Sequence, residues 1–177
     1  MRTLTRVRTL CGRLDDRGNA LIEFAIVGPT CLLLLLVIFE LGYMILVQSV
    51  LDSSARDAAR MIRTGQVQAS GNAQTSFQNQ LCADTGWLIS CGSMIYQAQV
   101  FSNWSAAQNG LNQPPQRDAL GNLVSTGFNA GSSKDIVAVQ VSYNYKFFTL
   151  WVSSYLGGST QSAFLMSTVV FQNEPFS

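Results

Sequence analysis

The amino-acid sequence predicts an α+β fold, in which one long N-terminal helix packs against a small antiparallel sheet. An apolar run near the N-terminus continues into helix-compatible residues as far as Thr64. Farther on, the residues from Val137 to Phe147 alternate between apolar and polar side chains. The alternation has the period of two that is typical of a strand. A chain of 177 residues suits one such domain with an anchor, and it is too short for two ordinary domains.

Residues 1–18 form a basic leader ahead of the apolar run. It contains five arginines but only two acids, Asp15 and Asp16. The arginines are Arg2, Arg6, Arg8, Arg13 and Arg17. Because positive residues stay on the cytoplasmic side of a membrane, the N-terminus is expected in the cytoplasm. The rest of the chain then lies in the periplasm, if the source is a bacterium with an envelope.

Residues 19–42 are predicted to be a single transmembrane helix in the bacterial inner membrane. The run from Asn19 to Phe39 would form about 30 Å of helix, which matches the hydrocarbon thickness of a bilayer. Five consecutive leucines, Leu32–Leu36, leave no polar face, which argues against a buried core helix. A secretory signal peptide has a shorter apolar region followed closely by a small-residue cleavage site. Here the nearest such site, Ser53–Ala55, lies well beyond the run.

Residues 43–65 are expected to continue the same helix beyond the membrane and to end at Gly65, in a left-handed cap. Apolar and small residues form a stripe along this part that suits packing under a sheet. The stripe consists of Val47, Val50, Leu51, Ser54, Ala58, Met61 and Ile62. Pro29 removes one helical hydrogen bond, so we expect a kink or a loosened turn near Ala25.

Residues 66–177 are predicted to form an exported β-rich domain. Strands are expected at Met94–Phe101, Val137–Phe147 and Phe164–Gln172, in a sheet with a dry face on the helix and a wet face in water. Phe77 and Leu81 indicate a short second helix. The segment from about 102 to 135 is rich in Asn, Gln, Gly, Ser and Pro, and it is interpreted as a long surface loop.

The composition limits the classes of function. From Gln66 onward the sequence holds seven charged residues, so this part is polar through amides and hydroxyls. Nucleic acid is not expected as a partner, because its phosphates call for clustered Lys and Arg. The sequence contains no histidine, which excludes a Ser-His-Asp triad and makes a zinc site improbable. We therefore expect no catalytic residue, no metal and no cofactor, and the protein is not predicted to be an enzyme.

Two of the four cysteines lie in the exported part. Cys82 and Cys91 are nine residues apart and could close a small disulfide loop, as export to an oxidising compartment allows. The alternative is a pair of unpaired, buried cysteines. The other two lie in the leader, Cys11, and in the membrane span, Cys31.

The junction between leader and apolar run carries a resemblance to a known family. Arg17-Gly18 is followed by Asn19-Ala20-Leu21-Ile22-Glu23, which resembles the cleavage site of a type IV prepilin. The wider pattern Gly18-x-Ala20-x-x-Glu23-Phe24-Ala25, with Pro29 and the leucines, is similar to the TadE-like minor pilins of the tight adherence (Tad or Flp) system. The resemblance implies a type IV pilin-like fold and cleavage by a prepilin peptidase between Gly18 and Asn19.

Two departures refine this resemblance. The major Flp pilins are very short and have Glu followed by Tyr, whereas this chain has Phe24 and a sizeable distal domain. A minor pilin or pseudopilin is therefore expected. The first residue of the mature protein would be Asn19 where the family usually has Phe.

The resemblance implies a role in assembling a pilus that serves adhesion or secretion. The implied partners are the prepilin peptidase, other pilin and minor pilin subunits, the inner-membrane assembly platform and membrane lipid, and the protein could reach the extracellular pilus. Glu23 would pair with the new amine on Asn19 of another subunit. The alternatives for Glu23 are a pair with its own Asn19 amine and simple solvation. The alternative for the whole protein is an uncleaved, membrane-anchored periplasmic binding module.

Overall fold

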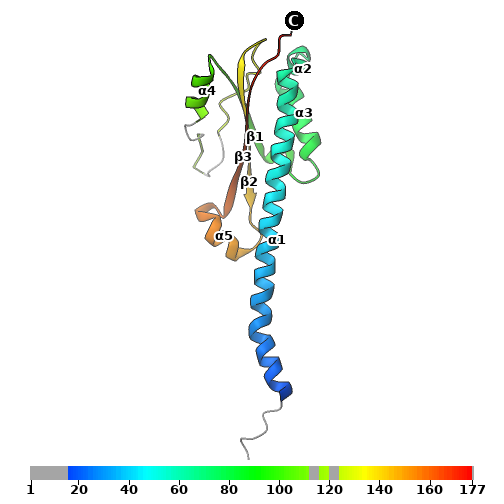
Figure 1. Cartoon of the computed structure of the whole chain (residues 1–177), viewed down its shortest axis with the longest axis vertical. Coiled ribbons are helices and arrows are strands. Elements are labelled where there is room, and N and C mark those ends of the chain that lie inside the picture. Colours follow the sequence, from blue (N-terminus) through cyan, green and yellow to red (C-terminus); the bar gives the residue numbers. More distant parts are fainter. Residues whose placement is uncertain (1–15, 112–115, 120–123, 177) are drawn as a thin grey trace, which may run out of the picture. The chain divides into compact units, whose positions relative to one another are not determined.

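The computed structural model describes residues 16–111, 116–119 and 124–176. The helices are α1 (Asp16–Arg63), α2 (Gln66–Ala69), α3 (Ala73–Thr85), α4 (Trp104–Leu111) and α5 (Leu150–Leu156), as Figure 1 shows. The strands are β1 (Met94–Phe101), β2 (Ile136–Lys146) and β3 (Ser162–Gln172). Single 3₁₀ turns lie at Cys91–Ser93 and Gly158–Thr160. The chain divides into two compact units, one ending at Phe39 and one running from Glu40 to Ser177.

Helix α1 ends where the sequence predicts a cap. Its last residue is Arg63, and Gly65 has a φ of 78°, the left-handed conformation that glycine adopts without strain. The N–H of Gly65 donates to the carbonyl of Ile62 at 3.1 Å. A Cβ at this position would lie 2.6 Å from the ring of Phe176. Gly65 is therefore required both for its backbone conformation and for the close approach of the C-terminal segment.

Within the second unit, α1 buries the stripe that the sequence predicts. Val47, Leu51, Ala58 and Ile62 are buried, as is Ser54, while Val50 and Met61 are half-buried. The stripe also includes two small residues, Ala55 and Ala59. Both belong to the hydrophobic core of the second unit.

The sheet has three antiparallel strands in the order β1-β2-β3. Met94 pairs with Tyr143 and Phe101 with Ile136, and β2 pairs with β3 from Ile136–Gln172 to Lys146–Ser162. The three predicted strands are present, with β2 and β3 beginning slightly earlier than expected. An α+β fold with a long helix and a small antiparallel sheet is thus confirmed.

One face of this sheet forms the core with α1. Alternate residues of β2, starting at Val137, meet alternate residues of β3 and the buried stripe of the helix. Phe77 and Leu81 of α3 belong to the same core, so the predicted second helix is present. Burial of these side chains supplies the main free energy that holds helix and sheet together.

The predicted wet second face is only partly present, because it is buried along β2 although Thr168 of β3, which pairs with Gln140, is exposed on it. Every residue from Ile136 to Ser142 is buried, including Gln140 and Ser142, which belong to the second face. Helix α4 packs here, because the ring of Phe101 lies against Gly110. Buried amides are hydrogen-bonded to one another, since Gln97 Nε2 donates to Gln140 Oε1.

The segment 102–135 is correspondingly more than a surface loop. It contains α4, and Gly127 and Asn129 exchange backbone hydrogen bonds with Ala98 of β1, at 3.2 and 2.9 Å. These bonds cover the outer edge of β1. The Pro114–Pro115 part of the predicted loop lies outside the described residues.

Candidate functional site

In the part of the first unit that the structure describes, from residue 16 onward, the helix surface is apolar and exposed. Large apolar side chains from Leu21 to Phe39 are exposed on all sides of α1. The helix is long and apolar enough to cross a membrane. Such a surface needs lipid or other apolar helices around it. The predicted single membrane span is supported to that extent.

The predicted cleavage residues and Glu23 lie on this helix. Because α1 begins at Asp16, Gly18, Asn19 and Glu23 are all helical. The space beside the Cα of Gly18 is open, since a Cβ added there would meet no atom within 4 Å. Glu23 is exposed, and within the described part of the chain it belongs to neither of the two ion pairs. The carboxylate is therefore available to a partner outside the chain.

Helix α1 continues without interruption through Pro29. Proline lacks an N–H, so the carbonyl of Ala25 loses its usual helical donor. At the next position, the hydroxyl of Thr30 donates to the carbonyl of Ile26 at 3.1 Å. The predicted kink near Ala25 stays a prediction, and the missing hydrogen bond is its physical basis.

Cys82, near the end of α3, and Cys91, at the start of the 3₁₀ turn before β1, are joined by a disulfide bond. Their Cα atoms lie 5.3 Å apart, within the range that a disulfide requires. The bond fastens α3 to the start of the sheet.

Glu40 is a buried carboxylate that sequence reasoning missed. Its side chain is 0 % exposed. Oε1 accepts from the N–H of Phe148 at 2.6 Å and of Thr149 at 3.3 Å. Oε2 accepts from the hydroxyl of Thr149. The signal in the sequence was an isolated acid directly after an apolar run, which is costly unless it is hydrogen-bonded.

Aromatic side chains surround this carboxylate. Tyr43 lies 6.1 Å from Tyr145 and 6.4 Å from Phe148, measured between ring centroids. Burial raises the pKa of Tyr145 to about 12, and the nearby carboxylate of Glu40 contributes to the rise. Burial also raises the pKa of Tyr143. These two phenols therefore stay neutral at ordinary pH.

Polar contacts continue along α1 and tie it to β3. Gln48 Nε2 donates to the carbonyl of Met166 at 3.3 Å, and the hydroxyl of Ser167 donates to Asp52 Oδ1 at 2.6 Å. At the end of the helix, Arg63 pairs with Glu174 at 3.2 Å, and the Glu174 N–H donates to the Arg63 carbonyl. These bonds fix the register of the helix on the sheet.

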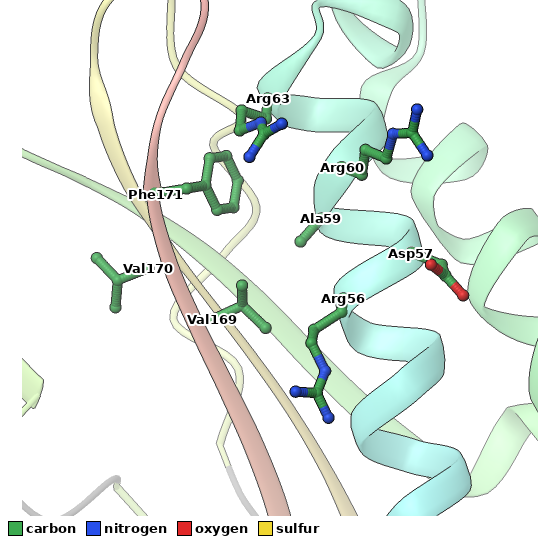
Figure 2. A pocket seen from close by; sticks show the side chains of 8 residues that line it. All are labelled: Arg56, Asp57, Ala59, Arg60, Arg63, Val169, Val170 and Phe171. Carbon is green, nitrogen blue, oxygen red and sulfur yellow. The ribbon is translucent and has the colours of Figure 1, made fainter.

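A groove of about 380 Å³ opens between α1 and β3. It is lined by Arg56, Asp57, Ala59, Arg60, Arg63, Val169, Val170 and Phe171. Figure 2 shows Arg56 and Arg63 on the side of the helix toward β3, whereas Arg60 and Asp57 extend the other way. Since Arg56 pairs with Asp52 at 2.7 Å and Arg63 with Glu174, much of the positive charge of the groove is offset.

Comparison with known proteins finds a family match in the first part of the chain. Residues 18–60 match the family model described as TadE-like protein. No curated protein and no solved structure matches the chain. The matched segment begins at Gly18 and includes Glu23, Pro29, the apolar run and the buried Glu40. Residues 18–60 of this chain are therefore similar to TadE-like proteins, the resemblance that the pattern around Gly18 and Glu23 predicted.

Proposed function

We propose that this protein is a minor pilin or pseudopilin that is cleaved after Gly18 and contributes to the assembly of a Tad pilus. The observation that carries the proposal is the extent of the family match, which starts at Gly18 and covers the exposed apolar helix. Residues 1–17 of the leader lie outside the match, as expected for a segment that is removed.

The helix would act by packing. Cleavage removes the five arginines of the leader that hold the N-terminus in the cytoplasm, and it creates an amine on Asn19. The exposed apolar surface between Leu21 and Phe39 can then pack against the helices of other pilin subunits instead of against lipid. In that bundle Glu23 would meet the amine of a neighbour, an attraction strengthened by the low dielectric.

Before assembly the protein would be held in the inner membrane with its C-terminal domain in the periplasm. Its proposed partners are the prepilin peptidase, other pilins and minor pilins, and the assembly platform. The proposal gives the protein no catalytic role. An uncleaved, membrane-anchored binding module is the second candidate, and the groove between α1 and β3 is the feature that would serve it.

N-terminal sequencing of the protein extracted from membranes tests the proposal. Asn19 as the first residue supports pilin processing, whereas Met1 supports the static anchor. Gly18→Leu should block cleavage without affecting membrane insertion, because it adds bulk next to the scissile bond. Gly42→Leu is the matched control, since Gly42 also lies in α1 with open space around it. Equal shortening of both variants would contradict the assigned site.

A further inference from the structure

Helix α5 lies beside the point where α1 enters the second unit. The chain leaves β2 at Lys146, and the N–H groups of Phe148 and Thr149 donate to the carboxylate of Glu40. Glu40 directly follows Phe39, the last residue of the exposed apolar run. The start of α5 is thereby held beside Glu40, the first residue of the second unit.

The outer surface of α5 is apolar and aromatic. Leu150 and Tyr155 are 78 % and 81 % exposed, and Trp151 is 64 % exposed. With Ser154 these residues line a shallow hollow of about 280 Å³. Val152 and Ser153 face the opposite way and are buried. The largest apolar side chains of this seven-residue helix point outward, so the described residues of the domain do not cover them.

The charges around α5 favour a lipid surface. From Phe147 to Asn173 the sequence holds no Asp, Glu, Lys or Arg, so no ionic group of this segment opposes insertion. The acid that holds the start of the helix, Glu40, is buried and hydrogen-bonded. The exposed charge closest to α5 in the sequence is the positive Lys146, the sign that anionic headgroups attract. Trp and Tyr are the side chains enriched where a membrane meets water.

We propose that α5 lies in the interface of the same membrane that α1 crosses, with Leu150, Trp151 and Tyr155 among the lipids. The occupant of this apolar surface is the headgroup and upper acyl-chain region of the bilayer, which is continuous with the lipid around α1. The inference requires the membrane anchoring but not the pilus role. It adds a second membrane contact, which restricts how the domain tilts over the bilayer.

The full chain in phospholipid vesicles provides the test, with tryptophan fluorescence as the signal. One variant keeps Trp151 alone, through Trp87→Phe and Trp104→Phe. The matched control keeps Trp104 alone, through Trp87→Phe and Trp151→Phe. Trp104 is also exposed, and it lies just after β1. The last residue of β1, Phe101, pairs with Ile136 at the start of β2. Helix α5 follows the other end of β2. The strands place Trp104 about 30 Å farther along the sheet.

Phospholipids brominated high on the acyl chain should quench Trp151 strongly and leave Trp104 almost unchanged. Aqueous iodide should do the reverse. Changing Leu150→Gln and Tyr155→Gln in the Trp151 variant should restore quenching by iodide. These side chains are exposed, so the domain should still fold.

Two results would overturn the proposal. If iodide quenches Trp151 as well as Trp104, α5 lies in water. If neither quencher reaches Trp151, another protein surface covers the helix. Extraction at alkaline pH, which leaves integral proteins in the membrane, is measured alongside. A chain that stays in the membrane with Trp151 in water disproves the interfacial helix alone, and the anchoring stands.

Discussion

Two glutamates on α1 illustrate how local surroundings decide the role of a carboxylate. Glu40 is sealed from solvent, and its oxygens accept hydrogen bonds from Phe148 and Thr149. These hydrogen bonds offset the free-energy cost of burying the carboxylate. Glu23 is exposed on an apolar helix and lies outside the ion pairs of the described residues. An exposed carboxylate of this kind needs an external partner, whether water, lipid headgroups or another subunit.

Glu23→Gln tests whether that partner is another pilin. The substitution keeps the shape and removes the charge, so we expect normal insertion and cleavage but loss of recruitment into the pilus complex. Co-purification with other pilins is the measurement, and N-terminal sequencing is the control for processing. Recovery at wild-type levels would show that Glu23 is not the assembly residue.

Glu40→Ala should destabilise the second unit. It leaves the partly buried N–H groups of Phe148 and Thr149 without their acceptor, so we expect a loss toward the lower end of the about 1–3 kcal/mol that a buried unsatisfied donor costs. Glu40→Gln retains an oxygen acceptor and should lose less. Urea unfolding of the full chain in detergent gives the free energies. The structural role fails if the Ala variant unfolds at the same urea concentration as the wild type.

The raised pKa of Tyr145 predicts that the second unit loses stability in alkali. Its folded pKa of about 12 exceeds the ordinary value of 10.0 for tyrosine, so its contribution is complete below pH 10 and declines as the pH rises toward 12. Tyr145→Phe should remove part of this decline. Because the Tyr145 hydroxyl has no hydrogen-bond partner among the described residues, the change should cost little at neutral pH. Thermal unfolding across the alkaline range measures both effects, and an unchanged profile would argue against the assignment.

At the scale of elements, the sequence was most informative where one physical pattern dominated. The period of two in Val137–Phe147 located β2, and the stripe from Val47 to Ile62 located the buried side of α1. Helices α4 and α5 were missed because they are short and depend on tertiary contacts. Asn103, whose Oδ1 accepts from the Ala106 N–H at 2.7 Å, is a helix N-cap signal that Gly110 and the surrounding polar residues obscure.

The same reasoning explains which site residues could be found. Gly18 and Glu23 belong to a local pattern that sequence alone displays. Glu40 could not be placed, because its partners are 108 and 109 residues away. The burial of the second face along β2 was missed for a related reason. In the sequence Gln140 has the pattern of a solvent-facing residue. In the fold its side chain accepts a hydrogen bond from Gln97, which in turn accepts one from Thr126.

Removing the Cys82–Cys91 bond should lower the free energy of unfolding by roughly 2–3 kcal/mol, in the chain-entropy picture. Serine at both positions keeps the size of the side chains while freeing the connection between α3 and β1. Cys31→Ser is the control, because Cys31 is exposed on α1. Mass spectrometry of the non-reduced wild type provides a direct check. Alkylation of both Cys82 and Cys91 would contradict the pairing.

At the scale of the molecule, ion pairs contribute little to the stability of the second unit. Among the described residues its ion pairs are Arg56–Asp52 and Arg63–Glu174, which have partly exposed side chains, and such pairs contribute about 0–1 kcal/mol. Its core is apolar, and its buried polar groups pair mainly through amides and hydroxyls. Stability should consequently come from contacts that salt does not screen.

The unfolding temperature of the second unit should therefore change little with ionic strength. At about 1 M salt the Debye length falls to about 3 Å, which weakens the two exposed ion pairs and leaves the core untouched. Calorimetry in chloride salts, which avoids the stabilising effect of sulfate, provides the measurement. A large drop in unfolding temperature would mean that charge contributes more than the structure indicates.

The hydrogen bond between Asp52 and Ser167 joins residues 115 positions apart, and this separation has a consequence for biogenesis. The buried side of α1 is made early, whereas β2 and β3, which cover it, come near the end of the chain. Contacts so distant in sequence form slowly. During synthesis the domain therefore carries an uncovered apolar stripe until its last strand arrives. Truncated products that lack β3 would be open to aggregation and to proteolytic quality control.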